Sequence, residues 1–248
     1  MAVSVTAALL IIGDEILTGR TKDKNIGYIA EYLTGIGIDL REVRIVPDVE
    51  AEIVAAVNAL RQRYTYLFTT GGIGPTHDDI TADSVAKAFG VGIGHDPRAV
   101  AKLQERYQAG ELNEARMRMA RIPEGADLIE NPISKAPGFR IGNVFVMAGV
   151  PAIMQVMLDS IAPTLETGAK MISRLIEAEG IPEGHYAEGL AAIAAADERV
   201  SIGSYPSFSA SGFRNQIVVR GKDAAAVEAA AEAVNQLLAR LKGDRNPL

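Results

Sequence analysis

One stretch of thirteen residues, 69–81, combines glycines, hydroxyl groups and carboxylates, and we call it the glycine loop. Glycines let a backbone approach a ligand closely, and the unpaired N–H groups at the start of a following helix favour a phosphate. Asp78 and Asp79 would repel a bare phosphate, so we expect a divalent cation such as Mg²⁺ between these carboxylates and the ligand. The glycine loop therefore predicts an anion site beside a metal site.

An ordinary strand-to-helix turn is the alternative interpretation of the glycine loop. Thr76 and Asp79 have the spacing of a capping box, and residues 79–89 predict a helix that ends at Gly90. The glycines lack the spacing of the dinucleotide fingerprint, and no Gly-Lys-Ser/Thr sequence ends the loop as in a P-loop. The residue types alone leave a binding site and a structural turn both open.

A second pair of carboxylates, Asp14 and Glu15, follows an apolar run over residues 5–12. Ligands of open parallel sheets bind beyond the carboxyl ends of the strands, so this pair and the glycine loop are expected to face one crevice. We expect Asp14 to join Asp78 and Asp79 in holding the cation. The alternative is that Asp14 and Glu15 merely cap the helix that follows them.

A loop punctuated by prolines covers residues 131–139. Its rigidity would position Ser134 and Lys135, and Lys135 would meet a phosphate as a point charge. An ordinary surface loop with a solvated lysine is the alternative. A further turn, which includes Gly149 and Pro151, follows another apolar segment and suits the close approach of a ligand.

Apolar periodicity alternates between strand and helix over most of the chain. Residues 5–12, 67–70 and 143–148 are apolar on both faces and predict interior parallel strands. Helical spacing between them is typical of a parallel α/β sheet with helices on both faces. Residues 96–121 are charged and helix-prone, and they predict an excursion of two helices.

The pattern changes near residue 170. The expected elements are strands over 171–176, 199–203 and 214–220, and helices around 190 and over 227–241. This β-α-β-β-α order predicts a small α+β domain over 169–248, after an α/β domain over 1–168. We expect the tail, 243–248, to fray.

Composition excludes several classes of function. The absence of cysteine rules out disulfides, thiolate catalysis and cysteine-bound metal, and the three histidines lack the spacing of a helical zinc motif. A net charge of −6 argues against a sequence-independent nucleic-acid binder. Without a signal-like leader or an apolar run long enough to span a bilayer, we expect a cytoplasmic protein with no membrane partner.

Four motifs together resemble the molybdopterin-binding-like domain of the MoaB/Mog superfamily. They are the glycine loop, Gly13-Asp14-Glu15-Ile16-Leu17, Ala136-Pro137-Gly138-Phe139 and Ala148-Gly149-Val150-Pro151. More narrowly, they resemble the group that contains the N-terminal part of CinA proteins and the corresponding domain of FAD synthases. The resemblance implies a three-layer α/β/α sandwich with a mostly parallel sheet. Gly203-Ser204-Tyr205-Pro206 extends the resemblance into the C-terminal part.

The resemblance also bears on activity. In the molybdopterin enzymes the glycine loop continues as Arg-Asp-x-Thr, whereas here Asp78 stands in place of the arginine and Asp79 and Thr81 remain. In the CinA and FAD synthase group, the aspartate-rich version is associated with metal-dependent cleavage of nucleotide diphosphates such as ADP-ribose or FAD. The resemblance thus implies pyrophosphate hydrolysis. Binding of molybdopterin, or of its adenylylated form, in molybdenum cofactor biosynthesis is one alternative, and a non-catalytic, ligand-binding homo-oligomer is another.

These arguments select one set of site residues around a single crevice. The expected catalytic and metal-holding residues are Asp14, Asp78 and Asp79. The expected residues for a nucleotide or pterin ligand are Thr70, Gly71, Gly72, Gly74, Pro75, Thr76, Thr81, Ser134, Lys135, Pro137, Gly138, Gly149 and Pro151. The expected partners are therefore a small-molecule ligand and further copies of the chain.

Overall fold

The computed structural model describes residues 4–108, 110–206, 208–209 and 212–243. The chain divides into two compact units, Met1–Gly168 and Ala169–Leu248. Of the tail expected to fray, 243–248, Gly243 is the last residue of α9, and residues 244–248 lie outside the described residues, so for them the expectation stays a prediction. Among the described helices, none has the length and apolar character that crossing a bilayer requires.

A six-stranded sheet forms the centre of the first unit. In spatial order its strands are β2 (Asp39–Val46), β1 (Thr6–Ile12), β3 (Tyr66–Thr70), β8 (Val144–Met147), β7 (Gly138–Ile141) and β6 (Asp127–Ile129). The first four are mutually parallel, whereas β7 and β6 continue the sheet as antiparallel strands. The three predicted interior strands are confirmed as β1, β3 and β8.

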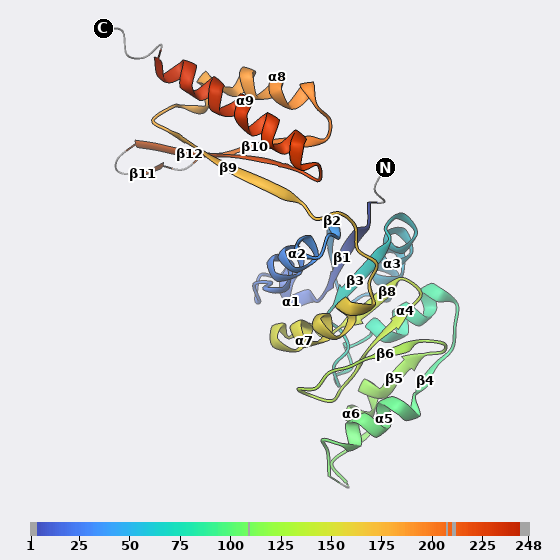
Figure 1. Ribbon diagram of the computed structural model, residues 1–248. Coiled ribbons are helices and arrows are strands. Elements are labelled where there is room, and N and C mark those ends of the chain that lie inside the picture. The colour runs from blue at the N-terminus through green and yellow to red at the C-terminus, as the bar shows by residue number, and fades with distance from the viewer. Residues whose placement is uncertain (1–3, 109, 207, 210–211, 244–248) are drawn as a thin grey trace. The chain divides into compact units, whose positions relative to one another are not determined.

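Helices cover both faces of this sheet (Figure 1). On one side pack α2 (Asn25–Gly35) and α7 (Pro151–Ile161), which the short turn η2 (Ala162–Thr164) continues. On the other side pack α3 (Glu50–Arg63) and α4 (Thr81–Phe89). Alternate residues of β1 serve the two cores, since Leu9 lies in the first and Leu10 in the second. The three-layer α/β/α sandwich is thus confirmed.

The charged middle segment only partly matches its prediction. It contains α5 (Pro97–Gln104), the single turn α6 (Glu114–Met117) and the turn η1 (Arg118–Ala120). Asp96 caps α5 by accepting a hydrogen bond from the backbone N–H of Arg98. A two-stranded ribbon of β4 (Ile93–His95) and β5 (Arg121–Pro123), which the helical pattern did not predict, closes the segment at its base.

The second unit has an antiparallel sheet covered on one face by two helices (Figure 1). Its elements are β9 (Ile172–Glu179), η3 (Glu183–His185), α8 (Ala187–Ala196), β10 (Val200–Tyr205), β11 (Phe208–Ser209), β12 (Gly212–Gly221) and α9 (Ala224–Gly243). Strand β12 pairs with β9, β10 and the short β11, which the sequence pattern did not predict. The inner face, including Ile176 and Ile217, packs against Val227 and Val234 of α9. The predicted α+β character is confirmed.

Candidate functional site

A cleft of about 620 Å³ is lined by the segments that follow β1, β3 and β8. These segments contribute Glu15 of the short helix α1 (Asp14–Leu17), Gly71 of the glycine loop, and Gly149. The segment from α5 to η1 and the loop after β6 also line the cleft, with Tyr107 and Ser134 among their residues. The volume falls in the range usual for small-molecule sites, which is about 300–1,000 Å³.

The glycine loop turns sharply against β1. Gly71 has φ 103° and Gly72 has φ 66°, and both values lie in the region that favours glycine. A Cβ at Gly71 would overlap the carbonyl oxygen of Ile12, and one at Gly72 would overlap the hydroxyl of Thr81. Thr81 closes the turn, because its hydroxyl donates to the carbonyl of Gly71 at 3.0 Å and its N–H to that of Gly72 at 3.0 Å. Thr81 therefore fixes the backbone of the glycine loop at Gly71 and Gly72.

Asp79 has a structural partner and also lines the cleft. Its Oδ2 accepts hydrogen bonds from the N–H of Thr76 at 2.8 Å and from the Thr76 hydroxyl at 2.6 Å. Because α4 begins at Thr81, this pair closes a turn ahead of the helix instead of capping it. Helix α4 ends at Gly90 in the left-handed conformation, as predicted. A Cβ at Gly74 would lie 2.7 Å from Asp79 Oδ2, so the bare glycine makes room for the carboxylate.

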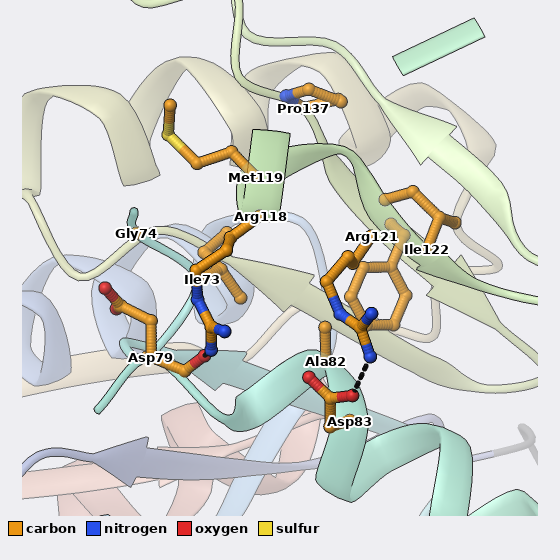
Figure 2. Close-up of a pocket in the computed structure, with 12 residues that line it drawn as sticks. Ile73, Gly74, Asp79, Ala82, Asp83, Arg118, Met119, Arg121, Ile122 and Pro137 are labelled. Carbon is orange, nitrogen blue, oxygen red and sulfur yellow. Dashed lines mark hydrogen bonds and ion pairs between the residues drawn. The ribbon is translucent and has the colours of Figure 1, made fainter. Parts of the chain in front are cut away.

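Arg118 holds the glycine loop from the excursion. Its Nε donates to the carbonyl of Thr76 at 3.1 Å, and its guanidinium also donates to the carbonyl of Asp79 at 3.2 Å. Figure 2 shows Arg118 and Asp79 beside a small hollow of about 10 Å³, next to the ion pair between Arg121 and Asp83. The sequence analysis missed Arg118, because no motif marks it and its partners lie far away in the chain.

Four carboxylates share one electrostatic neighbourhood beside the cleft. Asp48, which follows β2, accepts a hydrogen bond from the backbone N–H of Asp14 at 2.9 Å. Burial raises the pKa of Asp48 above its ordinary value. The hydrogen bond from Asp14 opposes this shift, whereas the charges of Asp14, Glu15 and Asp78 add to it. The sequence analysis missed Asp48, although its position just after a strand could have indicated the same sheet edge.

The predicted metal ligands do not form a preassembled cage. In the part of the chain that the structure describes, no group of three or more His, Cys, Asp or Glu side chains is arranged to hold a metal ion. Asp14 and Asp78 lie in the neighbourhood of Asp48, whereas Asp79 binds Thr76. Mg²⁺ commonly uses one or two carboxylates together with substrate phosphates and water. The donor set fits a cation that is shared with the ligand.

The loop after β6 is organised by one buried amide. The Oδ1 of Asn131 accepts from the N–H of Ser134 at 3.1 Å, and its Nδ2 donates to the carbonyl of Ala136 at 2.8 Å. Ser134 lines the cleft, as predicted for a ligand contact. Lys135 is not among the described lining residues, and its Nζ pairs with Glu105 at 2.8 Å. The hydrogen bond to Glu105 raises the pKa of Lys135, and the Lys135 ammonium group is therefore already paired with a carboxylate.

The other predicted contacts divide between ligand-facing and structural positions. Thr70, Gly149 and Pro151 line an adjoining pocket of about 260 Å³, which shares Gly71 and Glu15 with the cleft and which we call the inner branch. Pro137 borders the small hollow in Figure 2. Gly138 lies within β7, where a Cβ would overlap the carbonyl oxygen of Val146, so this glycine serves the packing of the strand.

The outer wall of the cleft contains a pair that sequence reasoning did not predict as a site. The guanidinium of Arg116 lies 4.4 Å from the ring centroid of Tyr107, and both side chains line the cleft. Such a contact is a cation–π interaction. A charged group stacked on an aromatic ring therefore lines the same cleft as the glycine loop, and only the tertiary structure reveals it.

These features define a class of three-layer α/β/α sandwich proteins with a cleft at the carboxyl ends of parallel strands. The chain belongs to the family described as "Probable molybdopterin binding domain", which matches residues 8–167. Residues 170–244 match a second family, "FAD synthase, middle domain". The two matches meet close to the division between the compact units.

Individual relatives support this assignment. A protein of Aeropyrum pernix is 33% identical over 213 residues, which cover 82% of this chain and 80% of the relative. A CinA-like protein of Desulfosudis oleivorans is 36% identical over 204 residues, covering 77% of this chain and 49% of the relative. The crystal structure of the protein CinA with unknown function from Thermoplasma acidophilum matches with a TM-score of 0.62 and 33% identity, covering 65% of this chain and 98% of that one. The resemblance to the CinA and FAD synthase group is confirmed.

Proposed function

We propose that the cleft binds a nucleotide diphosphate and hydrolyses its pyrophosphate bond with the help of a divalent cation. ADP-ribose and FAD are the candidate substrates. The observation that carries the proposal is that the glycine loop lines a cleft of about 620 Å³ together with Glu15, one of the carboxylates that surround Asp48. The backbone of a glycine loop can bind a phosphate, and carboxylates can hold the cation that neutralises the charge of that phosphate.

Different residues would bind the phosphates, hold the cation and orient the glycine loop. The backbone of Gly71, Gly72 and Gly74 lines the cleft and would approach the phosphates closely. Asp14 and Asp78, which act electrostatically on Asp48, would share the cation with the ligand and water, and the cation as a Lewis acid would stabilise charge on the phosphoryl oxygens. Asp79 would orient the loop through Thr76 and face the ligand with its second oxygen.

Molybdopterin binding without hydrolysis is the second candidate. The family match to "Probable molybdopterin binding domain" over 8–167 favours it. Against it stands the acidic neighbourhood around Asp48, because an anionic pterin phosphate would need a cation or a basic side chain there. Lys135, the lysine that we expect to serve an anion, is paired with Glu105.

A substrate panel tests the proposal. Purified protein would be incubated with ADP-ribose, FAD, NAD and diadenosine compounds, with Mg²⁺ or Mn²⁺ and with a chelator, and released AMP would be measured by chromatography. We expect AMP only in the presence of metal, and we expect Asp78→Asn to lower the rate. Asp127→Asn is the matched control, because Asp127 is exposed on the edge strand β6 and, unlike Asp78, is not among the charges that raise the pKa of Asp48.

Two results would contradict the proposal or redirect it. If the chelator leaves the rate of hydrolysis unchanged, the reaction does not need a divalent cation, and that part of the proposal is wrong. Tight binding of molybdopterin with no AMP release from any substrate would favour the second candidate. The expected self-association and the cytoplasmic location stay predictions, and sedimentation velocity tests the first of them.

A further inference from the structure

We propose that the inner branch of the cleft binds an amino-bearing nitrogen heterocycle and that Asn25 accepts a hydrogen bond from its amino group. Adenine and the aminopyrimidinone of a pterin share this chemistry. The inference rests on the proposed function only in placing the phosphate of the same ligand on the glycine loop. Asn25 is the first residue of α2, and it lines the branch together with Thr70.

The amide of Asn25 is buried and half satisfied. The residue is 3% exposed, and its Nδ2 donates to the carbonyl of Gly149 at 2.8 Å. Its Oδ1 has no hydrogen-bond partner among the described residues. A flipped amide would set two acceptors against each other, so the contact with Gly149 fixes Oδ1 as an acceptor that needs a donor. An unpaired buried acceptor is unfavourable, and a bound donor would offset that cost.

A second unpartnered oxygen lies in the same wall. Thr70 is 1% exposed, and its hydroxyl has no partner among the described residues. A hydroxyl can donate to a ring nitrogen and can also accept from an N–H group. An amino-substituted heterocycle offers both a donor and an adjacent acceptor, so its edge complements Asn25 and Thr70 together.

Charged and apolar side chains both line the branch. Lys22 and Lys24 provide positive charge there for an anionic part of the ligand. The first N–H groups of α2 are already used, because the Oδ1 of Asp23 accepts from the N–H groups of Asn25 at 3.0 Å and Ile26 at 2.7 Å. Ile12 and Pro151 line the branch with apolar surface suited to the face of a flat ring.

The size and continuity of the branch also fit one extended ligand. Its volume of about 260 Å³ is several times the roughly 30 Å³ that one water occupies in the liquid. Gly71, Gly149 and Glu15 line both the branch and the main cleft. A ligand can therefore place its ring in the branch and its phosphate on the glycine loop.

Binding calorimetry on the whole chain tests the inference. AMP would be compared with purine riboside 5′-monophosphate, which lacks the amino group, and a pterin phosphate would be compared with its desamino analogue. We expect the amino compound of at least one pair to bind at least about tenfold more tightly. The pair that shows the preference identifies the source of the ring. AMP has no pyrophosphate bond, so this result does not depend on whether the chain hydrolyses its substrate panel.

Three variants sharpen the measurement. Asn25→Leu should abolish the preference for the amino compound, and Thr70→Val should weaken its binding. Thr69→Val is the matched control, because Thr69 is an equally buried strand residue with an unpartnered hydroxyl but is not among the described residues that line the branch. It should leave the preference intact. Thr70→Val and the wild-type comparison still decide the matter if Asn25→Leu does not fold.

Several outcomes would overturn the inference. Equal affinity for the amino and desamino compounds would mean that water alone satisfies Asn25. A preference that survives in Asn25→Leu would place the recognition elsewhere. Failure of all four compounds to bind at millimolar concentration would also overturn it, whereas selective binding without hydrolysis would overturn only the proposed function.

Discussion

The glycine loop and the loop over residues 131–137 both border the cleft, yet they differ in how much of their backbone a distant residue holds. In the glycine loop, Arg118 donates to two carbonyls, those of Thr76 and Asp79, in addition to the loop's own bonds. In the second loop the amide of Asn131 makes most of the bonds from within, and distant Arg106 donates to one carbonyl, that of Ile133. A loop fixed by the surrounding fold keeps its geometry when a ligand arrives, which is what phosphate binding by a backbone requires.

Both loops contain a residue with positive φ, which is a glycine in the glycine loop and a lysine in the second loop. Gly71 has φ 103° and no space for a side chain. Lys135 has φ 63° and is the single non-glycine residue with positive φ in the described part of the chain. A glycine in a required position and a lysine in an unfavourable one predict opposite responses to substitution. Replacing Gly71 by alanine, and Lys135 by glycine or alanine, therefore tests the comparison.

Gly71→Ala should have the largest effect on stability. The new Cβ would overlap the carbonyl oxygen of Ile12, and the left-handed backbone would be strained as well. Left-handed strain of about 1–2 kcal/mol and overpacking of about 1–3 kcal/mol give an expected loss of about 2–5 kcal/mol. Urea unfolding measures it. Gly90→Ala is the control, because Gly90 has φ 67° with open space around it and should lose only the strain.

Asp79→Asn should affect turnover more than folding. Asparagine can still accept the hydrogen bonds from Thr76, so the expected loss of stability is about 1 kcal/mol or less. If the charge serves the cation or the phosphates, turnover should fall about 10-fold to 1,000-fold, equivalent to about 1.4–4 kcal/mol in the barrier. Kinetics and unfolding would be measured on one preparation. Wild-type turnover per folded molecule would assign Asp79 a purely structural role.

Sequence patterns predict best where one residue type has one physical reason to be present. Strands β1, β3 and β8 are apolar on both faces, and a strand of that kind belongs inside a parallel sheet. Gly71 and Gly72 were predictable for a similar reason, since few other residues adopt their backbone conformation.

Features that depend on distant partners escape such patterns. Arg118 reads as a surface charge until the fold brings it to Thr76, and the flexible side chain of Lys135 is equally compatible with a phosphate or with Glu105. Asn25 resembles an ordinary residue at a helix start, and only its unpartnered oxygen marks the inner branch. The β4–β5 ribbon depends on pairing between segments that lie on either side of α5.

The carboxylates of the two units should respond to pH in opposite directions. Burial raises the pKa of Asp48, so the wild type loses stability as pH rises from about 4, the ordinary unfolded value, to its folded value. Asp48→Asn keeps the acceptor for Asp14 and should melt at a higher temperature than the wild type at pH 7, with the difference shrinking towards pH 3.5.

Asp197 in the second unit is the control for that measurement. Its hydrogen bonds with Arg199 lower its pKa to about 2, so its contribution is present above about pH 4 and disappears as pH falls towards 2. Asp197→Asn should therefore melt at a lower temperature than the wild type at pH 7. Melting shifts of the same sign for both variants would contradict the raised pKa of Asp48.

The smallest change in the free energy of unfolding is expected for substitutions of Lys135, the residue with positive φ in the second loop. Lys135→Gly removes left-handed strain of about 1 kcal/mol and loses an exposed ion pair with Glu105 worth about 0–1 kcal/mol. The expected net gain is therefore between about 0 and 1 kcal/mol in urea unfolding. Lys135→Ala keeps the strain and should be less stable than Lys135→Gly by about 1 kcal/mol. Because Lys135 is paired away from the cleft, both variants should retain wild-type affinity for AMP within about twofold, whereas a direct contact with phosphate would make that affinity fall about tenfold, or roughly 1.4 kcal/mol.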